Sequence, residues 1–396
     1  MKVKLGSRVY RRFLLGLFVT GVVAAIPGLL SVLFLYRAGE LTSYRDIAER
    51  QQETGEIYGS AVNGSNDLYK LELIRVRRPD VVVLGSSRVQ QIRGEFFNSS
   101  FVNAGASFRD MDSGERFVEE MYRIHTPKLV VIGIDFWWFN PLYQDDTLSQ
   151  GRDAGGLTRD KILLPLEWLA TGELSVGVFA RTIFGAGSDN EYTNQINLGM
   201  RALQSSAGFR PDGSFQYAQR FFGLVTDIDP KFSGTVARVT EGGFIFEEAA
   251  QISRSRWERF QAMVEFIRAQ GSEVILYTPP LAPPVLVAMS DGSRQYGYID
   301  KLQLEFGALG VPYYDFLSPN QTTSQVCEYA DGIHPGDVAS QRIVLEIAEQ
   351  TILGDYLNED LVREKIDQFS GYAHIIFDQS LFPLEELDFL ELGCDK

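Results

Sequence analysis

The sequence predicts an α/β protein, a three-layer α/β/α domain with a central parallel sheet, preceded by one transmembrane helix. Two observations predict this fold. First, short runs of consecutive apolar residues alternate with segments of helical periodicity, which is typical of a parallel sheet covered on both faces. Second, residues 13–36 contain no charged side chain. The length of 396 residues is enough for one large core with a sizeable insertion.

The uncharged segment near the N-terminus is long enough to span a membrane. Its 24 residues would form a helix of about 36 Å, against a hydrocarbon core of about 30 Å. The positive-inside rule places residues 1–12 in the cytoplasm and everything after residue 36 outside. A cleaved signal peptide is the alternative, but the apolar run is long for one and no clear cleavage site follows it. The basic residues before the span are Lys2, Lys4, Arg8, Arg11 and Arg12.

Five strands with intervening helices are predicted in the remainder of the chain. The helices over residues 114–125 and 254–270 carry their apolar residues on one face, and a closing helix is predicted over residues 337–353. Such stripes indicate core packing, and no cofactor is expected. The strands are predicted at residues 80–87, 101–107, 128–135, 273–280 and 311–316.

The predicted catalytic domain occupies residues 80–353. Residues 37–79, rich in Glu, Gln, Gly and Ser, are expected to form a membrane-proximal connector that is partly helical through RDIAERQQE. Residues 137–251 interrupt the strand–helix alternation, which predicts an insertion of short helices and loops that shapes a substrate cleft. Residues 354–396 form a C-terminal extension that is expected to pack on the periphery of the domain.

The negative charge and the small number of cysteines and histidines exclude several classes of function. A formal charge of -15 disfavours a nucleic-acid partner or an anionic lipid surface. Two cysteines and three histidines are too few, and wrongly spaced, for a zinc or histidine-rich centre, so no metal is expected. Cys327 and Cys394 could pair in an oxidising compartment or remain free thiols.

Ser87 is the candidate nucleophile. It follows the first predicted strand, close to Gly85, so its hydroxyl can stand clear of the sheet near backbone N–H groups that stabilise an oxyanion. The alternative is structural, because Gly-Ser-Ser also makes a good turn and helix N-cap.

Asp331 and His334 are the candidate acid and base. A serine needs a base to take its proton, and the base works better when an acid fixes its tautomer. The sequence ADGIHPGD supplies both from one loop just before the closing helix. The other histidines are weaker candidates, since His125 ends a helix and His374 lies in the apolar tail.

Taken together, these residues resemble the SGNH hydrolase family, also called GDSL esterases. In that family the serine follows the first strand, a glycine after the second strand lines the oxyanion hole, and D-x-x-H completes the triad. The resemblance assigns these roles to Ser87, Gly105 and the pair Asp331 and His334, and it covers roughly residues 80–353 apart from the insertion. It also assigns the Ser87 amide to the oxyanion hole.

The chain departs from that family pattern at two places. Ser86 stands where the family usually has an aspartate. Asp135 stands where an asparagine normally serves the oxyanion hole, and a carboxylate would repel a developing oxyanion unless it were protonated or turned away. Asn140 or Asn103 could replace that donor. A solvated or hydrogen-bonded residue at a strand end is the favoured interpretation of Asp135.

A single anchor followed by such a domain resembles two narrower groups, the membrane-anchored proteins of teichoic-acid D-alanylation and the alginate O-acetyltransferases. The resemblance implies a single-pass protein of the bacterial inner membrane, with its catalytic domain on the periplasmic or extracellular side. It implies ping-pong acyl transfer through an acyl-serine to a cell-surface or exported polysaccharide, beside a multi-span membrane O-acyltransferase. A carbohydrate esterase and a non-catalytic glycan-binding or scaffold protein are the alternatives.

Four residues near the predicted site are weak candidates for substrate contact. Arg88 and Arg109 could bind an anionic polymer, although a plain surface role is the alternative for each. Trp137 and Trp138 could stack on sugar rings, but core or cleft-wall packing is the favoured interpretation of both.

Overall fold

The computed structural model describes residues 7–62, 64–143, 157–185, 192–224, 228–292 and 295–396. Its central sheet is entirely parallel and has the strand order β3-β2-β4-β8-β9. The α/β prediction is thereby confirmed, and each of the five predicted strands is present. The strands are β2 (Val81–Gly85), β3 (Phe101–Gly105), β4 (Leu129–Gly133), β8 (Glu273–Thr278) and β9 (Tyr313–Asp315).

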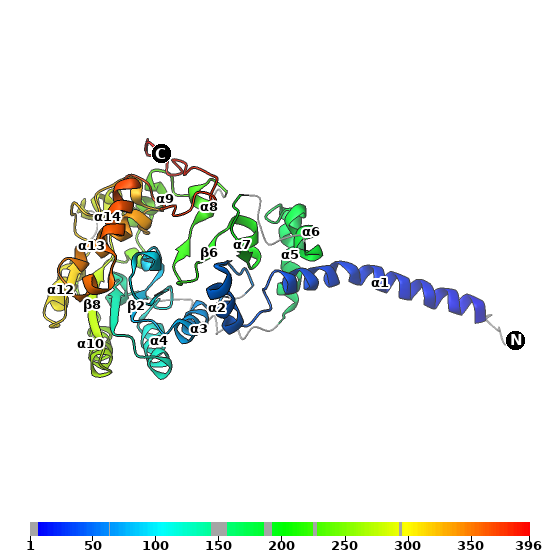
Figure 1. Cartoon of the computed structure of the whole chain (residues 1–396), viewed down its shortest axis with the longest axis horizontal. Helices are drawn as coiled ribbons and strands as arrows, with labels where there is room; N and C mark the ends of the chain where they lie inside the picture. Colours follow the sequence, from blue (N-terminus) through cyan, green and yellow to red (C-terminus); the bar gives the residue numbers. More distant parts are fainter. Residues whose placement is uncertain (1–6, 63, 144–156, 186–191, 225–227, 293–294) are drawn as a thin grey trace.

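Helices cover both faces of this sheet (Figure 1). Alternate side chains of each buried strand enter different cores, as the period of a strand requires: Val81 and Val83 belong to one apolar cluster, Val82 and Leu84 to the other. The first cluster is completed by α13 (Asp337–Ala348) and α14 (Glu359–Gln368). The second is completed by α3 (Asn66–Arg77), α4 (Met111–Ile124), α10 (Arg254–Ala269) and α12 (Gly297–Gly307).

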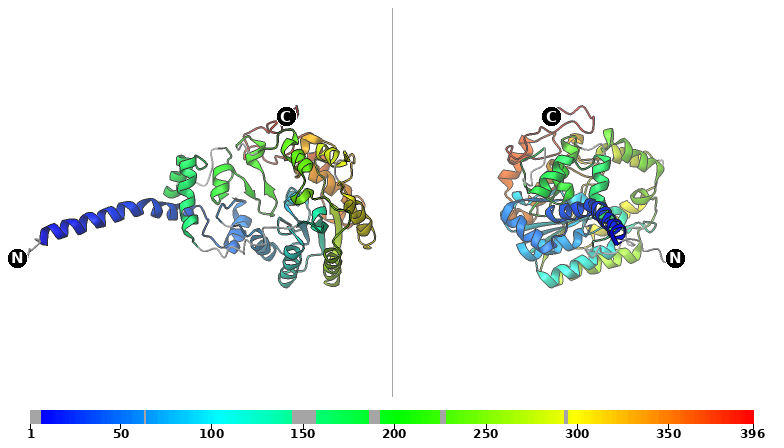
Figure 2. Two further views of the ribbon diagram at one scale, coloured as in Figure 1. Left: turned by 180° about the vertical axis from the view of Figure 1, so that it is seen from behind. Right: turned by 90° about the vertical axis from the view of Figure 1, so that its right-hand side faces the viewer.

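A long helix, α1 (Ser7–Arg37), projects from one end of the domain (Figures 1 and 2). Its segment Val9–Arg37 is long and apolar enough to cross a membrane, and its most apolar part is not buried inside the protein, whereas Ser31, Phe34 and Leu35 near its end are buried against the domain. Large side chains such as Phe13, Leu17 and Phe18 are exposed along it. Apolar surface of this length associates the chain with a membrane, as a bilayer anchor or a signal sequence.

Residues 37–79 are part of the folded domain, in contrast to the expected connector. They contain α2 (Tyr44–Thr54), the short strand β1 (Ile57–Tyr58) and α3. Ile47, Tyr69 and Leu73 are buried in the core that lies against the sheet. The polar composition misled the prediction because these helices bury only one face each.

The chain also turns rigidly from α1 into the domain. Glu40 is buried, and its Oε1 accepts hydrogen bonds from the Ala61 and Met200 amides at 3.1 and 2.6 Å. The Gly199 amide donates to the Ala38 carbonyl at 2.7 Å. The end of α1 is therefore held by segments that are remote in the sequence.

The insertion at residues 137–251 contains short helices and loops, as expected, and also strands. Strands β5 (Asn197–Leu198), β6 (Gly208–Phe209) and β7 (Phe215–Gln216) join β1 in a second, four-stranded sheet. Two-residue strands are too short to be detected by an alternating pattern. The described helices of this region are α5 (Arg159–Thr171), α6 (Val176–Phe184), α7 (Met200–Ser205), α8 (Ala218–Phe221) and α9 (Ser233–Glu241).

The C-terminal extension packs on the domain through α14 and an irregular tail. Cys394 in this tail forms a disulfide with Cys327, so the two thiols left open by the sequence are paired. Lys396 Nζ donates to the Cys327 and Gly371 carbonyls, at 3.1 and 2.9 Å. The end of the chain is thus fixed close to the loop that carries Asp331 and His334.

Candidate active site

The structure brings Ser87, His334 and Asp331 together at the carboxyl edge of the central sheet. Ser87 begins a 3-10 turn (Ser87–Val89) directly after β2, while the other two lie in the loop before α13. Ser87 Oγ is 2.8 Å from His334 Nε2, and His334 Nδ1 is 2.8 Å from Asp331 Oδ2. Through such contacts a histidine can take a proton from a serine while a carboxylate fixes the imidazole tautomer.

The topology explains why a site forms at this place. From β2 the chain proceeds to β3 on one side and then to β4 on the other, so the connections diverge above the end of β2. Such switch points leave a crevice where parallel-sheet proteins bind ligands. Gly85 permits the close turn there, because a Cβ at this position would lie 2.7 Å from Val89 Cγ1.

Asp331 is held as a carboxylate by its surroundings. Its Oδ1 accepts hydrogen bonds from the Ile333 and His334 amides, both at 2.8 Å. Burial would raise the pKa of Asp331, but His334, Arg220 and the backbone amides outweigh burial and hold the pKa well below its usual range. The residue can therefore orient and charge-stabilise an imidazolium without becoming protonated itself.

Arg220 and Tyr217 reach this triad from the insertion. Arg220 Nη1 donates to Asp331 Oδ2, and the Arg220 guanidinium lies 5.2 Å from the centre of the Tyr217 ring. The Tyr217 and His334 ring centroids are 6.0 Å apart. Both residues were missed by the sequence analysis. The only local signal is the short helix α8 beginning at Ala218, which says nothing about distant Asp331.

The oxyanion-hole expectation for Gly105 is not met in this structure. The Gly105 amide donates to Asn103 Oδ1 at 2.8 Å, and Asn103 Nδ2 donates to the Val89 and Ile92 carbonyls at 2.8 Å each. An amide and a carboxamide that satisfy each other are not available to an oxyanion. The Ser87 amide remains a candidate, because the first N–H of a helical turn has no acceptor within that turn.

Asn140 also differs from its expected role in the oxyanion hole. It is completely buried, its Nδ2 donates to the Glu247 carbonyl at 2.7 Å, and its Oδ1 accepts from the Leu142 amide at 2.8 Å. The side chain thus holds the backbone in place after the turn Phe136–Phe139. Local hydrogen bonding of this kind is common for asparagine in loops.

Arg88 is buried, whereas substrate contact or a plain surface role was expected for it. Its side chain is 1% exposed and forms an ion pair with Asp135 at 2.9 Å. Its Nε donates to the Ile333 carbonyl at 3.3 Å, so Arg88 connects the serine turn to the histidine loop. Burial raises the pKa of Asp135, with partial compensation by Arg88. Asp135 points at this arginine, as the hydrogen-bonded interpretation of the residue required.

The two tryptophans belong to the core, so the sugar-stacking interpretation is not supported by their positions. Trp138 stacks on Phe108 with ring centroids 4.1 Å apart, and Trp137 is buried beside the Arg88 guanidinium. Arg109, in contrast, is exposed just before α4.

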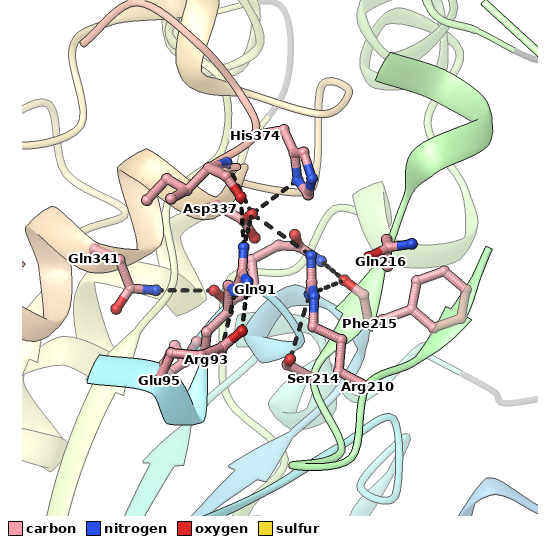
Figure 3. Close-up of polar contacts among 12 residues, drawn as sticks. Gln91, Arg93, Glu95, Arg210, Ser214, Phe215, Gln216, Asp337, Gln341 and His374 are labelled. Carbon is pink, nitrogen blue, oxygen red and sulfur yellow. Dashed lines mark hydrogen bonds and ion pairs between the residues drawn. The ribbon is translucent and has the colours of Figure 1, made fainter. Parts of the chain in front are cut away.

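A buried ion network around Asp337 joins the segments that follow Ser87 and His334 in the sequence (Figure 3). Arg93, six residues after the serine, donates through Nη1 to Asp337 Oδ2 at 3.0 Å, three residues after the histidine. His374 Nδ1 lies 2.9 Å from the same oxygen, and Arg210 Nη2 lies 3.7 Å from it. Arg93 and Asp337 therefore fix the register between the nucleophile turn and the base loop.

Comparison of the chain with protein-family models, with curated proteins and with solved structures finds no match. Within the described part of the chain, no group of three or more His, Cys, Asp or Glu residues could hold a metal ion.

Proposed function

We propose that this protein is a membrane-anchored serine acyltransferase that acts outside the cytoplasm on the hydroxyl groups of a cell-surface or exported polysaccharide. The observation that carries the proposal is the unbroken hydrogen-bonded series from Ser87 through His334 to Asp331. A serine in this arrangement is activated for attack on an acyl carbonyl.

The chain's own residues perform two half-reactions. His334 Nε2 takes the Ser87 proton as Oγ bonds to the acyl carbon, and the same proton then passes to the departing group of the donor. A sugar hydroxyl next gives its proton to His334 and bonds to the acyl carbon; the bond from that carbon to Ser87 Oγ breaks, and His334 returns the proton to Oγ. Asp331, held by Arg220, stabilises the imidazolium in both steps.

Three observations support the location, and the acceptor follows from a resemblance. The exposed apolar helix α1 supports a single-pass anchor, and the basic residues before it support a cytoplasmic N-terminus. The Cys327–Cys394 disulfide fits an oxidising compartment on the far side of the membrane. The polysaccharide acceptor, and a multi-span membrane protein as the source of acyl groups, follow from the resemblance of the triad and anchor to polysaccharide O-acyltransferases.

Labelling with a serine-reactive fluorophosphonate tests the activated serine. We expect the full chain in detergent to be labelled, and Ser87→Ala and His334→Ala to lose the label. Ser255→Ala, which removes an exposed serine of α10, is the matched control and should label like wild type. Labelling that persists in Ser87→Ala would contradict the proposal.

A non-catalytic glycan-binding or scaffold role is the second candidate. It is favoured by one observation, the engagement of the Gly105 amide and the Asn140 side chain, which removes two expected oxyanion donors. Folded wild-type protein that binds glycan but never forms an acyl-serine would favour this role. If labelling succeeds, incubation with an acyl donor and a glycan separates transfer from hydrolysis, because an esterase releases free acid where a transferase forms acylated glycan.

A further inference from the structure

Helices α5 and α6 contain many large apolar residues, but few of these residues are buried in the protein. Of the 13 residues of α5, only Pro165 is buried. The large apolar residues of this helix are all partly or fully exposed, although a surface helix normally turns such residues into the core. These residues are Ile162, Leu163, Leu164, Leu166, Trp168 and Leu169.

The apolar surface continues onto the neighbouring helix. Val176 at the start of α6 is 72% exposed and Phe184 at its end is 82% exposed. Leu157 and Leu163 of the α5 region are exposed as well. Several large apolar side chains exposed on two successive helices of a folded domain are typical of a surface that is covered in the functional state.

The position of these helices along α1 indicates what covers them. Ser31 of α1 donates a hydrogen bond to the Ile162 carbonyl, and the rings of Phe34 and Phe179 stack with centroids 4.9 Å apart. From Phe13 to Ser31 the helix rises by about 27 Å, close to the hydrocarbon thickness of about 30 Å. The crossing with α5 therefore lies at the boundary where α1 leaves the hydrocarbon.

The direction of the two helices agrees with this position. Both lie across α1 at the end where it enters the domain (Figures 1 and 2). With α1 along the membrane normal, α5 and α6 run approximately parallel to the bilayer plane. That is the orientation of a helix resting in the lipid headgroup region.

We infer that α5 and α6 form a second membrane contact, with their exposed apolar side chains inserted at the boundary between lipid headgroups and acyl chains. The inference rests on α1 as a membrane anchor, which is part of the proposed function, and is independent of the acyl chemistry. The ligand is the bilayer itself. Because the chain carries a charge of -15, attachment depends on apolar burial and requires no anionic lipid.

Site-directed spin labelling of the full chain in phosphatidylcholine nanodiscs tests this contact. The labels replace Phe184 and Val176 in α6, Phe18 in α1, and the 77%-exposed Leu304 in α12 as the water-exposed control, each through a single cysteine substitution. The native cysteines are paired and do not react. Collision rates with oxygen, which concentrates in lipid, are compared with those of a water-soluble nickel chelate.

We expect Phe18→Cys to report the bilayer interior, Leu304→Cys to report water, and the labels at residues 176 and 184 to report a shallow lipid depth in both low and high salt. Water-like collision rates at residues 176 and 184, with a lipid signal at residue 18, would overturn the inference and leave the anchor intact. A water signal at residue 18 would overturn the anchor as well. Labels at residues 176 and 184 that are shielded from both agents would show cover by protein and would also refute a lipid contact.

Discussion

Arg220 links the insertion to the catalytic series at the level of single residues. Its hydrogen bond to Asp331 is charge-assisted, and the same carboxylate already accepts two backbone amides and the His334 ring. The insertion is therefore more than a cleft wall, because it supplies a cation that keeps the acid of the triad ionised.

Replacement of Arg220 should slow the reaction of Ser87 with the fluorophosphonate but should not abolish it. Loss of a charge-assisted hydrogen bond of about 1.5–3 kcal/mol predicts a decrease of about tenfold or more in the fluorophosphonate labelling rate of Arg220→Ala. Arg220→Lys should retain part of the rate. The exposed Arg201→Ala is the control and should behave like wild type. Equal labelling rates for Arg220→Ala and wild type would show that this contact is only structural.

The network around Asp337 predicts how stability depends on pH. Burial lowers the pKa of His374, so only the unfolded chain takes up this proton below about pH 6.5, and stability falls as the pH decreases from there. Burial would raise the pKa of Asp337, but Arg93, Arg210 and His374 hold it well below its usual range. The stability contributed by Asp337 is present above about pH 4 and is lost as the pH falls toward its folded-state pKa.

Denaturant unfolding between pH 7 and pH 3 measures both effects. The free energy of unfolding of wild type should decrease between pH 7 and pH 5. We expect His374→Gln to reduce the slope of this decrease by up to about 1.4 kcal/mol per pH unit. Asp337→Asn should be destabilised by about 3–5 kcal/mol at pH 7, because the buried Arg93 and Arg210 both lose the carboxylate that they share, and its free energy of unfolding should decrease less than that of wild type below pH 4. Unchanged slopes in both variants would show that neither group is linked to folding.

At the level of elements, the disulfide joins the C-terminal tail to the segment that leads into the loop of Asp331 and His334. Cys327 lies four residues before Asp331, and the pair closes a segment with a sequence separation of 67. Closing a loop of this length is worth about 4 kcal/mol in the chain-entropy model. The tail therefore supports the loop that carries the acid and the base.

Removal of this disulfide should lower the free energy of unfolding. We expect the double variant Cys327→Ser, Cys394→Ser to lose about 2–4 kcal/mol in a denaturant titration. Reductant should bring wild type to the level of the variant and leave the variant unchanged. A wild-type protein whose unfolding curve does not respond to reductant would contradict the pairing.

The elements that could be predicted from the sequence are those with a long local signal. Strands β2 and β4 are continuous apolar runs and β3 and β8 are mostly apolar, as expected for strands buried on both faces, and all five central strands were predicted. The strands β1, β5, β6 and β7 contain two residues each, and they exist because segments remote in the sequence pair with one another. No local pattern encodes such pairing, so residues 37–79 were taken for a connector.

Some residues of the candidate site could be predicted from the sequence and others could not. Ser87, Asp331 and His334 could be chosen because each follows a recognisable strand or precedes a recognisable helix. The burial of Arg88 and the pairing of Gly105 with Asn103 depend on which partner is closest in space. Long side chains such as that of Arg220 can reach many partners, and only the folded chain decides among them.

For the whole molecule, the rigid turn at residues 38–40 has a mechanical consequence. The Ala38 carbonyl and the Glu40 carboxylate are hydrogen-bonded to the domain, so the end of α1 is attached directly to the domain that carries Ser87. In the proposed orientation, Ser87 would stand at a constant height above the lipid and could not sweep through the surrounding space. A polymer strand would have to move past Ser87 to be modified along its length. The spacing of its modifications would then depend on the speed of export.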